Sequence, residues 1–481
     1  MRTFLSRSAA AVALGALAFA GACKEATSVP DLNNLPSSTI AGGFTPTTFQ
    51  LLLTGLVNQD RANFGFRYLV FEETQARDVY VLDPSENRFI TELLGNQIDP
   101  GGFSGAGNFL GFYEAVNTAN ALINGAATVG TFAAADQAAA KGFAQTIKAL
   151  QLYRVFTSRG PNGLVADAVA PGAPLPPVLC QQDGLARISA LLDTAITNLK
   201  AGGATFPFTL PPGFSSNGTF NTPATFVKVA YGLKGRAEVY RGILGRAQSY
   251  TDAIAALNAS FLDATGNFSN GVYYTYSTAA NEQVNPLAAV TIYLNPLVGT
   301  RIAAGDLRSS KITTVAKRTL NGVSSTFKSP LASTSNLTGS IPWLRNAELV
   351  LLRAQAEIGA GQLAAATADI NAVRTAEGGL PAYSTFTSAA QAIGAALYEK
   401  QYSLLLTGAQ RIVDLRSYGY LNANGYTVPP GSYMNLTPAN QYTFPQEQGA
   451  LDLYLSAFPL PKAELDARGG ASKVTLTCSS S

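Results

Sequence analysis

Residues 344–374 read LRNAELVLLRAQAEIGAGQLAAATADINAVR. Apolar and small side chains, among them Leu351 and Ala354, recur every three to four positions in the first half, which is the spacing of one helix face. The pattern stops at the glycines of residues 359–361 and resumes toward Ile370. Because glycine commonly ends a helix, the segment predicts two helices joined by a tight turn.

Residues 229–262 have the same organisation, with a break at Gly245 and an alanine-rich second half. Together with residues 345–374 they resemble tetratricopeptide units, which are repeats of about 34 residues. Small residues let paired helices approach closely, and stacked pairs form a superhelix. The sequence therefore predicts a mainly α fold. We expect tetratricopeptide-like helix pairs that form a superhelical scaffold, with long irregular loop insertions and a few short strands.

Five further segments show helical spacing, and two of them carry start signals. Asp183 is expected to cap the fourth of these helices, and Thr222 followed by proline is expected to start the fifth. The five predicted helices cover residues 49–57, 108–124, 134–158, 185–199 and 222–244.

Composition excludes several classes of function. Only 13% of the 481 residues are charged, the formal net charge is +3, and no run of Lys or Arg stands out, which argues against a nucleic-acid partner. The chain contains no histidine, so a Ser-His-Asp triad, a Cys-His pair and a His-ligated zinc are impossible. We expect neither a metal nor a cofactor, and a binding protein is favoured over an enzyme.

The amino terminus predicts export. Arg2 and Arg7 precede the apolar run of residues 9–19, which is too short to span a bilayer, and the small residues 20–22 lead directly to Cys23. This order resembles a bacterial lipobox, in which the signal peptide is cut before a cysteine that then carries lipid. The alternative is an ordinary signal peptide with a cysteine nearby.

The lipobox divides the chain into three parts. Residues 1–22 are predicted to be a lipoprotein signal peptide, residues 23–43 a lipidated tether, and residues 44–481 a single α-helical domain. Several acyl chains on one cysteine attach a protein firmly to a membrane. No later segment has about 18 uninterrupted apolar residues, so no second membrane span is expected.

Cys180 and Cys478 remain once Cys23 is assigned to lipid. Disulfides persist in exported proteins, and Cys478 lies in a polar tail where no apolar environment requires it. We predict a Cys180–Cys478 disulfide, and two free thiols are the alternative.

Two groups of residues are candidates for ligand binding. The loop-rich insertion of residues 264–341 carries a first group, and an earlier irregular segment carries a second. Aromatic rings stack on the apolar faces of sugars, and neighbouring polar groups pair with hydroxyls. Ordinary loop packing is the alternative for both groups. The first comprises Tyr273, Tyr274, Tyr276 and Asn281, and the second Arg67, Asp78, Tyr80 and Arg88.

Several segments in order resemble the SusD/RagB family of outer-membrane nutrient-binding lipoproteins. Besides the lipobox and residues 344–374, these are residues 112–120, FYEAVNTAN, residues 397–416, LYEKQYSLLLTGAQRIVDLR, and residues 458–461, FPLP. Residues 397–416 depart from the family pattern at three positions, Lys400, Thr407 and Ile412. The resemblance covers nearly the whole mature chain.

The resemblance implies a role. The protein would bind a nutrient, either a glycan or an oligopeptide, and deliver it to a SusC-like TonB-dependent transporter. It would be lipid-anchored to the outer membrane and face the cell exterior. A surface glycoside hydrolase, which needs a pair of carboxylates in a cleft, remains an alternative. A helical-repeat scaffold that binds only proteins is another.

Charged residues within the apolar helices call for a separate interpretation. Charges buried in helical interfaces need partners, so we expect interhelical pairs between arginine and carboxylate rather than catalytic groups. The residues concerned are Arg345, Glu348, Glu357, Arg374, Glu399, Arg411, Asp414 and Arg416.

The lipobox gives a direct test. Replacing Cys23 with serine removes the thiol expected to be acylated, so C23S should lose metabolic labelling with palmitate and leave the membrane fraction. Each buried methylene of an acyl chain stabilises attachment by about 0.8 kcal/mol. Cys180→Ser should behave like the wild type in both measurements. A labelled, membrane-bound C23S protein would contradict the assignment.

Overall fold

The computed structural model describes residues 43–94, 98–106, 109–169, 172–408, 410–418, 421–422, 425–426 and 457–479. The predicted signal peptide and nearly all of the predicted tether, Cys23 included, lie outside these ranges. Within them, none of the helices combines the length and apolar composition needed to cross a bilayer.

Helices dominate the structure, as the sequence predicts. They are α3 (Pro46–Phe64), continued by a π-helical turn (Gly65–Val70), α4 (Phe71–Gln75), α5 (Arg88–Thr91), α6 (Leu110–Gly125), α7 (Ala134–Arg159), α8 (Gln181–Lys200), α9 (Pro223–Ile243), α10 (Gln248–Asn258), α11 (Pro296–Arg301), α12 (Asn346–Gly359), α13 (Leu363–Ala376), α14 (Ala389–Ser403), α15 (Gln410–Ser417) and α16 (Lys462–Ala467).

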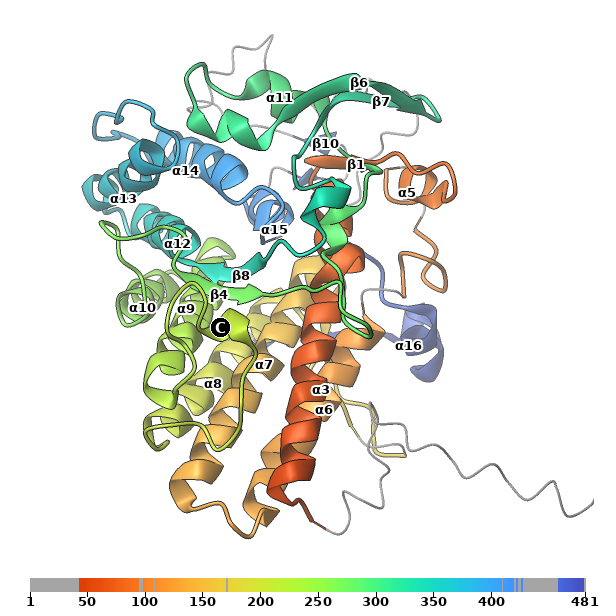
Figure 1. Ribbon diagram of the computed structural model, residues 1–481, viewed down its shortest axis with the longest axis vertical. Coiled ribbons are helices and arrows are strands. Elements are labelled where there is room, and N and C mark those ends of the chain that lie inside the picture. Colours follow the sequence, from red (N-terminus) through yellow and green to blue (C-terminus); the bar gives the residue numbers. More distant parts are fainter. Residues whose placement is uncertain are drawn as a thin grey trace, which may run out of the picture.

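Consecutive helices pack against each other and build an arc. α6 packs on α7, α7 on α8, α8 on α9 and α9 on α10, after which α12, α13 and α14 continue the series (Figure 1). The two predicted repeats are the pairs α9–α10 and α12–α13. Glycines allow the close approach: a Cβ on Gly142 of α7 would lie 2.9 Å from the carbonyl oxygen of Ala195 in α8. These observations confirm the predicted helix pairs.

The strands are short and lie mostly in the segments between helices. They are β1 (Val79–Val81), β2 (Leu164–Val165), β3 (Val178–Leu179), β4 (Gly271–Tyr274), β5 (Ile292–Leu294), β6 (Thr313–Leu320), β7 (Val323–Lys328), β8 (Ile341–Arg345), β9 (Leu421–Asn422), β10 (Gly425–Tyr426) and β11 (Leu476–Thr477).

Strand pairing organises the predicted insertion. β4 pairs antiparallel with β8, which runs directly into α12, while β5 pairs with β1 and β6 with β7. The hairpin β6–β7 and α11 lie together at one end of the molecule, beyond the ends of the long helices (Figure 1). Trp343 lies in β8 and is buried, so it belongs to the packed interior.

Charged residues between the helices are paired, as predicted. Most of the expected residues form ion pairs with another element, while Glu357 lies 3.8 Å from Arg353 of its own helix and Arg416 donates to the carbonyl oxygens of Phe156 and Thr157. The pairs between elements are Arg236–Glu348 at 2.5 Å, Arg345–Glu377 at 2.5 Å, Lys400–Asp414 at 2.7 Å, Arg374–Glu399 at 2.9 Å and Arg411–Asp78 at 3.1 Å.

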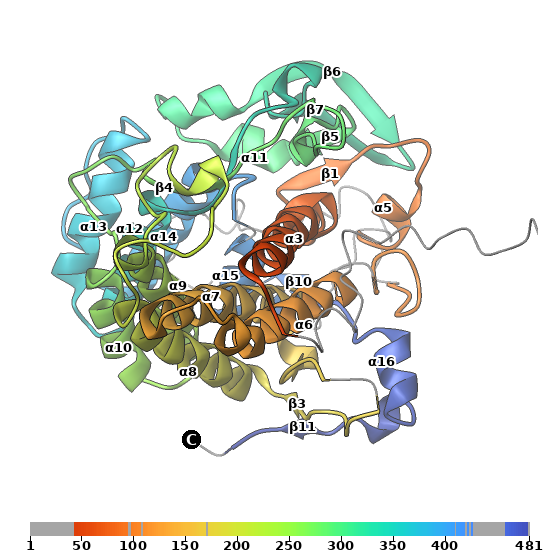
Figure 2. The same cartoon turned by 60° about the horizontal axis from the view of Figure 1, so that its bottom comes forward.

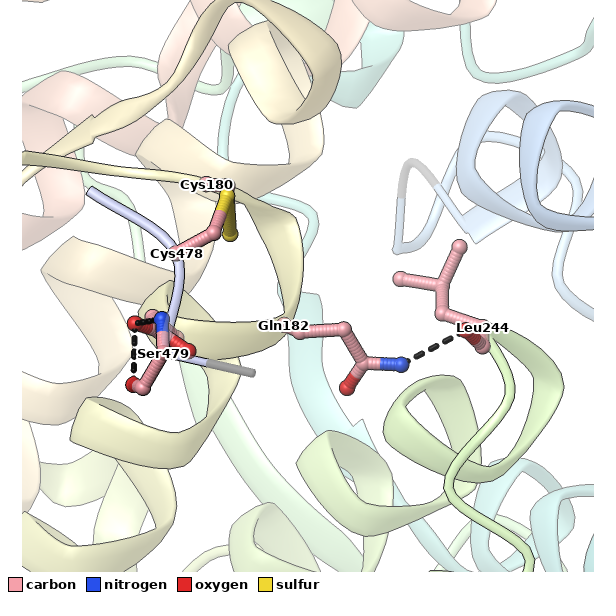
Figure 3. The surroundings of a disulfide bond; sticks show 6 residues. Cys180, Gln182, Leu244, Cys478 and Ser479 are labelled. Atoms are coloured by element: carbon pink, nitrogen blue, oxygen red, sulfur yellow. Dashed lines mark hydrogen bonds between the residues drawn. A yellow bond between two sulfur atoms is a disulfide. The ribbon is translucent and has the colours of Figure 1, made fainter. Parts of the chain in front are cut away.

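The carboxyl-terminal segment returns to the start of α8. β11 pairs parallel to β3, and a disulfide joins Cys478 to Cys180 with the Cα atoms 5.4 Å apart, as the sequence predicts (Figures 2 and 3). The predicted cap of α8 is wrong. The helix begins at Gln181, and Asp183, in its first turn, accepts hydrogen bonds from the backbone N–H and hydroxyl of Ser479.

The disulfide predicts a local effect on stability. Replacing Cys478 with serine should leave the helical arc folded, because the bond joins only β11 to the start of α8. The tail should become sensitive to limited proteolysis, and the loss of the cross-link should lower the free energy of unfolding by about 2–5 kcal/mol. Equal rates of tail cleavage in C478S and in the oxidised wild type would contradict this role.

Removing a buried charged side chain should lower the free energy of unfolding more than removing an exposed one. Glu399 is fully buried between Arg308 and Arg374, so Glu399→Ala leaves Arg374 without its carboxylate and leaves Arg308 paired with Asp306 alone. We expect urea denaturation to show a loss of about 3–5 kcal/mol. Asp466→Ala removes the exposed pair with Lys462 in α16 and should cost about 0–1 kcal/mol. Equal losses in the two variants would contradict the importance of burial.

Candidate binding surface

The two groups of candidate residues occupy different places in the structure. The first lies on β4 and the loop after it, next to β8 and the start of α12. The second lies around the end of α3, β1 and α5 (Figure 1). The structure therefore does not bring the two groups together. Within each group it separates exposed side chains from buried ones.

In the first group, β4 turns neighbouring tyrosines to opposite sides. Tyr274 is buried, and its hydroxyl donates to Asp60 at 2.6 Å and accepts from Arg154. Tyr276 is also buried. Both side chains therefore belong to the packed interior, the alternative that the sequence left open.

Tyr273 and Asn281 remain accessible. Tyr273 is half-buried, and its hydroxyl donates to the carbonyl oxygen of Ser269 at 2.5 Å. Asn281 is exposed and has a positive φ of 65°, a conformation that asparagine tolerates better than most residues. A ligand role for these two side chains stays a prediction.

In the second group, Asp78 and Tyr80 are buried. The Asp78 carboxylate pairs with Arg411 and accepts a hydrogen bond from Gln401 at 2.8 Å, while the Tyr80 hydroxyl accepts one from Asn295 at 2.9 Å. These contacts join β1 to α15, to α14 and to the segment after β5. Asp78 and Tyr80 therefore position the loop that follows β1, and their side chains do not lie on the surface of the protein.

Arg67 and Arg88 are exposed, and both lie over a ring that the sequence interpretation missed. The guanidinium carbons are 6.0 Å and 4.5 Å from the centroid of Phe103, which is partly exposed. We call Arg67, Arg88 and Phe103 the arginine–phenylalanine surface. Cation–π attraction of this kind contributes about 0.5–1 kcal/mol at an exposed site. The glycine-rich stretch around Phe103 was the available signal, because it predicts a loop that presents one aromatic ring.

Buried aromatic rings pack against Phe103 and support this surface from the interior of the protein. The Phe103 ring centroid lies 5.1 Å from that of Phe89 and 5.4 Å from that of Phe71, and both of these rings are buried. The buried Ser104 donates a hydrogen bond to Glu92 at 2.5 Å, and Arg159 donates to the carbonyl oxygen of Gly105 at 2.5 Å. The loop that carries Phe103 is therefore fixed at the two residues that follow the ring.

Arg88 forms an ion pair with Glu86, whereas Arg67 does not form one within the described part of the chain. Glu86 lies 2.5 Å from Nη2 and also accepts from Nε at 2.8 Å, and this pairing lowers the pKa of Glu86 to about 2. Arg67 makes no ion pair with any residue that the structure describes. The surface thus offers guanidinium donors beside an aromatic ring, which is suited to hydroxyl, carbonyl or carboxylate groups of a ligand.

The described ranges contain no group of three or more histidine, cysteine or carboxylate side chains that could hold a metal ion.

The chain matches no family model and no curated protein. Solved structures do match it over most of its length, and at sequence identities this low their likeness shows the fold.

Three of the similar structures illustrate the match. NanU of B. fragilis is 17% identical, with a TM-score of 0.61, over 89% of this chain and 95% of that one. A SusD-like carbohydrate binding protein from Bacteroides vulgatus ATCC 8482 is 14% identical, with a TM-score of 0.62, over 90% and 99%. Surface glycan-binding protein A from Bacteroides uniformis is 13% identical, with a TM-score of 0.61, over 83% and 92%. The fold that the motifs suggested is thereby confirmed: this chain has the SusD-like fold.

Proposed function

We propose that this protein is a lipid-anchored, surface-exposed protein of the outer membrane that captures a glycan and delivers it to a TonB-dependent transporter. The observation that carries the ligand-binding part is the arginine–phenylalanine surface, in which two exposed arginines lie over a partly exposed ring. The SusD-like fold, shared with proteins described as carbohydrate-binding and glycan-binding, supports a glycan as the ligand.

The geometry suits an extended polar ligand. A sugar ring can pack its C–H face against the exposed part of Phe103, while its hydroxyl oxygens accept hydrogen bonds from Arg67 and Arg88. Because the loop is held by the buried Ser104 and by Arg159, little conformational entropy is lost when a ligand binds. A rigid platform of this kind favours capture without chemistry.

The arginine–phenylalanine surface and the predicted tether lie at opposite ends of α3. α3 begins three residues after Gly43, where the predicted tether ends, and Arg67 follows three residues after its last residue, Phe64. A helix of 19 residues is about 28 Å long. The arginine–phenylalanine surface would therefore lie about 28 Å from the point where the tether joins the fold. Delivery to a transporter rests on the family resemblance.

Binding to a panel of oligosaccharides derived from starch, xylan, pectin and mannan tests the proposal. Arg67→Ala and Arg88→Ala should each weaken the best ligand about five- to tenfold, because each removes one charged hydrogen-bond donor. Phe103→Leu, which keeps an apolar side chain in the packed loop, should weaken it further by removing the flat ring. Isothermal titration calorimetry gives the affinities.

The control is Arg246→Ala, an exposed arginine in the turn between α9 and α10, which should leave the affinity unchanged. Unaltered affinity in all three surface variants would contradict the assigned surface. Binding of oligopeptides but of no oligosaccharide in the panel would contradict the glycan proposal.

A further inference from the structure

A hollow lies beside β4 and the start of α12. In Figure 1 these elements lie apart from α5, which begins at Arg88 of the arginine–phenylalanine surface. Its volume is about 390 Å³, which lies within the range of small-molecule sites. Three segments that are distant in sequence line it: the loop before α9, the turn after α10, and the first residue of α12. We call it the asparagine pocket, and its lining residues are Ser216, Asn217, Gly218, Asp263, Asn267, Asn270 and Asn346.

One buried side chain fixes the shape of this pocket. Asn346 is fully buried, and its amide nitrogen donates to the carbonyl oxygens of Asp263 at 2.6 Å and Asn267 at 3.2 Å. Its amide oxygen accepts from the backbone N–H of Asp263 at 2.8 Å. Its own backbone N–H donates to the carbonyl oxygen of Asn270 at 2.8 Å. The turn of residues 263–267 is thus held on α12 before any ligand arrives.

The side chains of Asn217 and Asn270 form few hydrogen bonds within the fold, and Asp263 adds an exposed carboxylate to the lining. The side chain of Asn270 forms no hydrogen bond with any residue in the described ranges, and that of Asn217 reaches only the Ser216 hydroxyl, at 3.5 Å. The Asp263 carboxylate accepts from the N–H and hydroxyl of Thr265 through one oxygen and also interacts with the backbone N–H of Gly266, and it lines the hollow as an exposed, charged acceptor. These hydrogen bonds hold the pKa of Asp263 below its ordinary value, and the group is ionised at neutral pH.

The chemistry of the lining restricts the class of ligand. Amide side chains both donate and accept hydrogen bonds, as adjacent hydroxyls of a sugar do, and a carboxylate accepts from two hydroxyls at once. The seven lining residues include one carboxylate but neither a cation nor an aromatic ring. An anionic sugar would meet the Asp263 charge without a compensating cation, and a planar aromatic ligand would find no stacking partner.

We propose that the asparagine pocket binds a single neutral saccharide residue through its hydroxyl groups, with Asn217, Asn270 and Asp263 as contacts and Asn346 as a positioning residue. This site is separate from the arginine–phenylalanine surface and stands whether or not that surface binds glycan. The bound residue would be either a free monosaccharide or one residue of a branched or folded glycan.

The test uses the mature protein and five probes: glucose, galactose, mannose, xylose and N-acetylglucosamine, each titrated in the millimolar range and followed by NMR. We expect at least one of them to bind. Asn270→Ala and Asp263→Asn should each weaken that sugar about five- to tenfold while Asn346 still holds the turn, because the first removes an amide and the second exchanges one acceptor oxygen and the negative charge for an N–H donor. Asp263→Asn keeps the size of the side chain, so it guards against an effect of altered shape.

Two controls separate this proposal from the previous one. Asn58→Ala replaces an exposed asparagine on α3, outside the pocket, and Arg88→Ala alters the other surface; both should leave monosaccharide affinity unchanged. Wild-type protein that binds none of the five sugars would overturn the proposal, as would full affinity in Asn270→Ala and Asp263→Asn. Loss of affinity in Arg88→Ala but not in these two variants would place the sugar on the other surface instead.

Discussion

The buried ion pairs between helices are the constraint on which the rest of the structure depends. A charge taken out of water is strongly destabilising unless a partner meets it with good geometry. Arg236 with Glu348, Arg374 with Glu399 and Lys400 with Asp414 therefore define how α9, α12, α13, α14 and α15 can be placed. Apolar packing alone would tolerate small shifts of one helix along another, whereas a shift here leaves a charge without its partner.

The same pairs connect the scaffold to its irregular segments. Asp78, directly before β1, is held by Arg411 of α15 and Gln401 of α14, and β1 leads through a loop to α5, which begins at Arg88. Arg159, at the end of α7, reaches the loop of Phe103. Asn346, at the start of α12, organises the asparagine pocket in the same manner. Ends of scaffold helices thus shape both proposed ligand surfaces.

Much of the scaffold could be predicted from sequence, because helical spacing and glycine breaks are local signals. The helix pairs, the superhelical arrangement and the need for charge pairing all follow from such patterns. The start of α8 could not be predicted, because a capping rule considers only residues near Asp183 in sequence. It does not include the distant tail that the disulfide of Cys478 holds next to Asp183. The pairing of that carboxylate with Ser479 depends on a contact across nearly 300 residues of chain.

The candidate sites were harder to predict, because a loop residue has no pattern that separates exposed from buried side chains. Tyr273 and Tyr274 are adjacent, yet one is accessible and the other is bound to Asp60 in the interior. Phe103 was missed because its significance comes from two arginines on other segments. The asparagine pocket combines three loops, and single asparagines in polar loops carry no distinguishing signal.

Hydrogen–deuterium exchange of the mature protein, with and without the best-binding oligosaccharide, tests the central claim most directly: a rigid helical arc presents ligand surfaces on its irregular segments. We expect slow exchange in α7, α8, α9 and α12 that ligand leaves unchanged, with added protection in residues 65–71, 86–94 and 98–106. Protection spread along the helical arc, with none in these segments, would contradict the account.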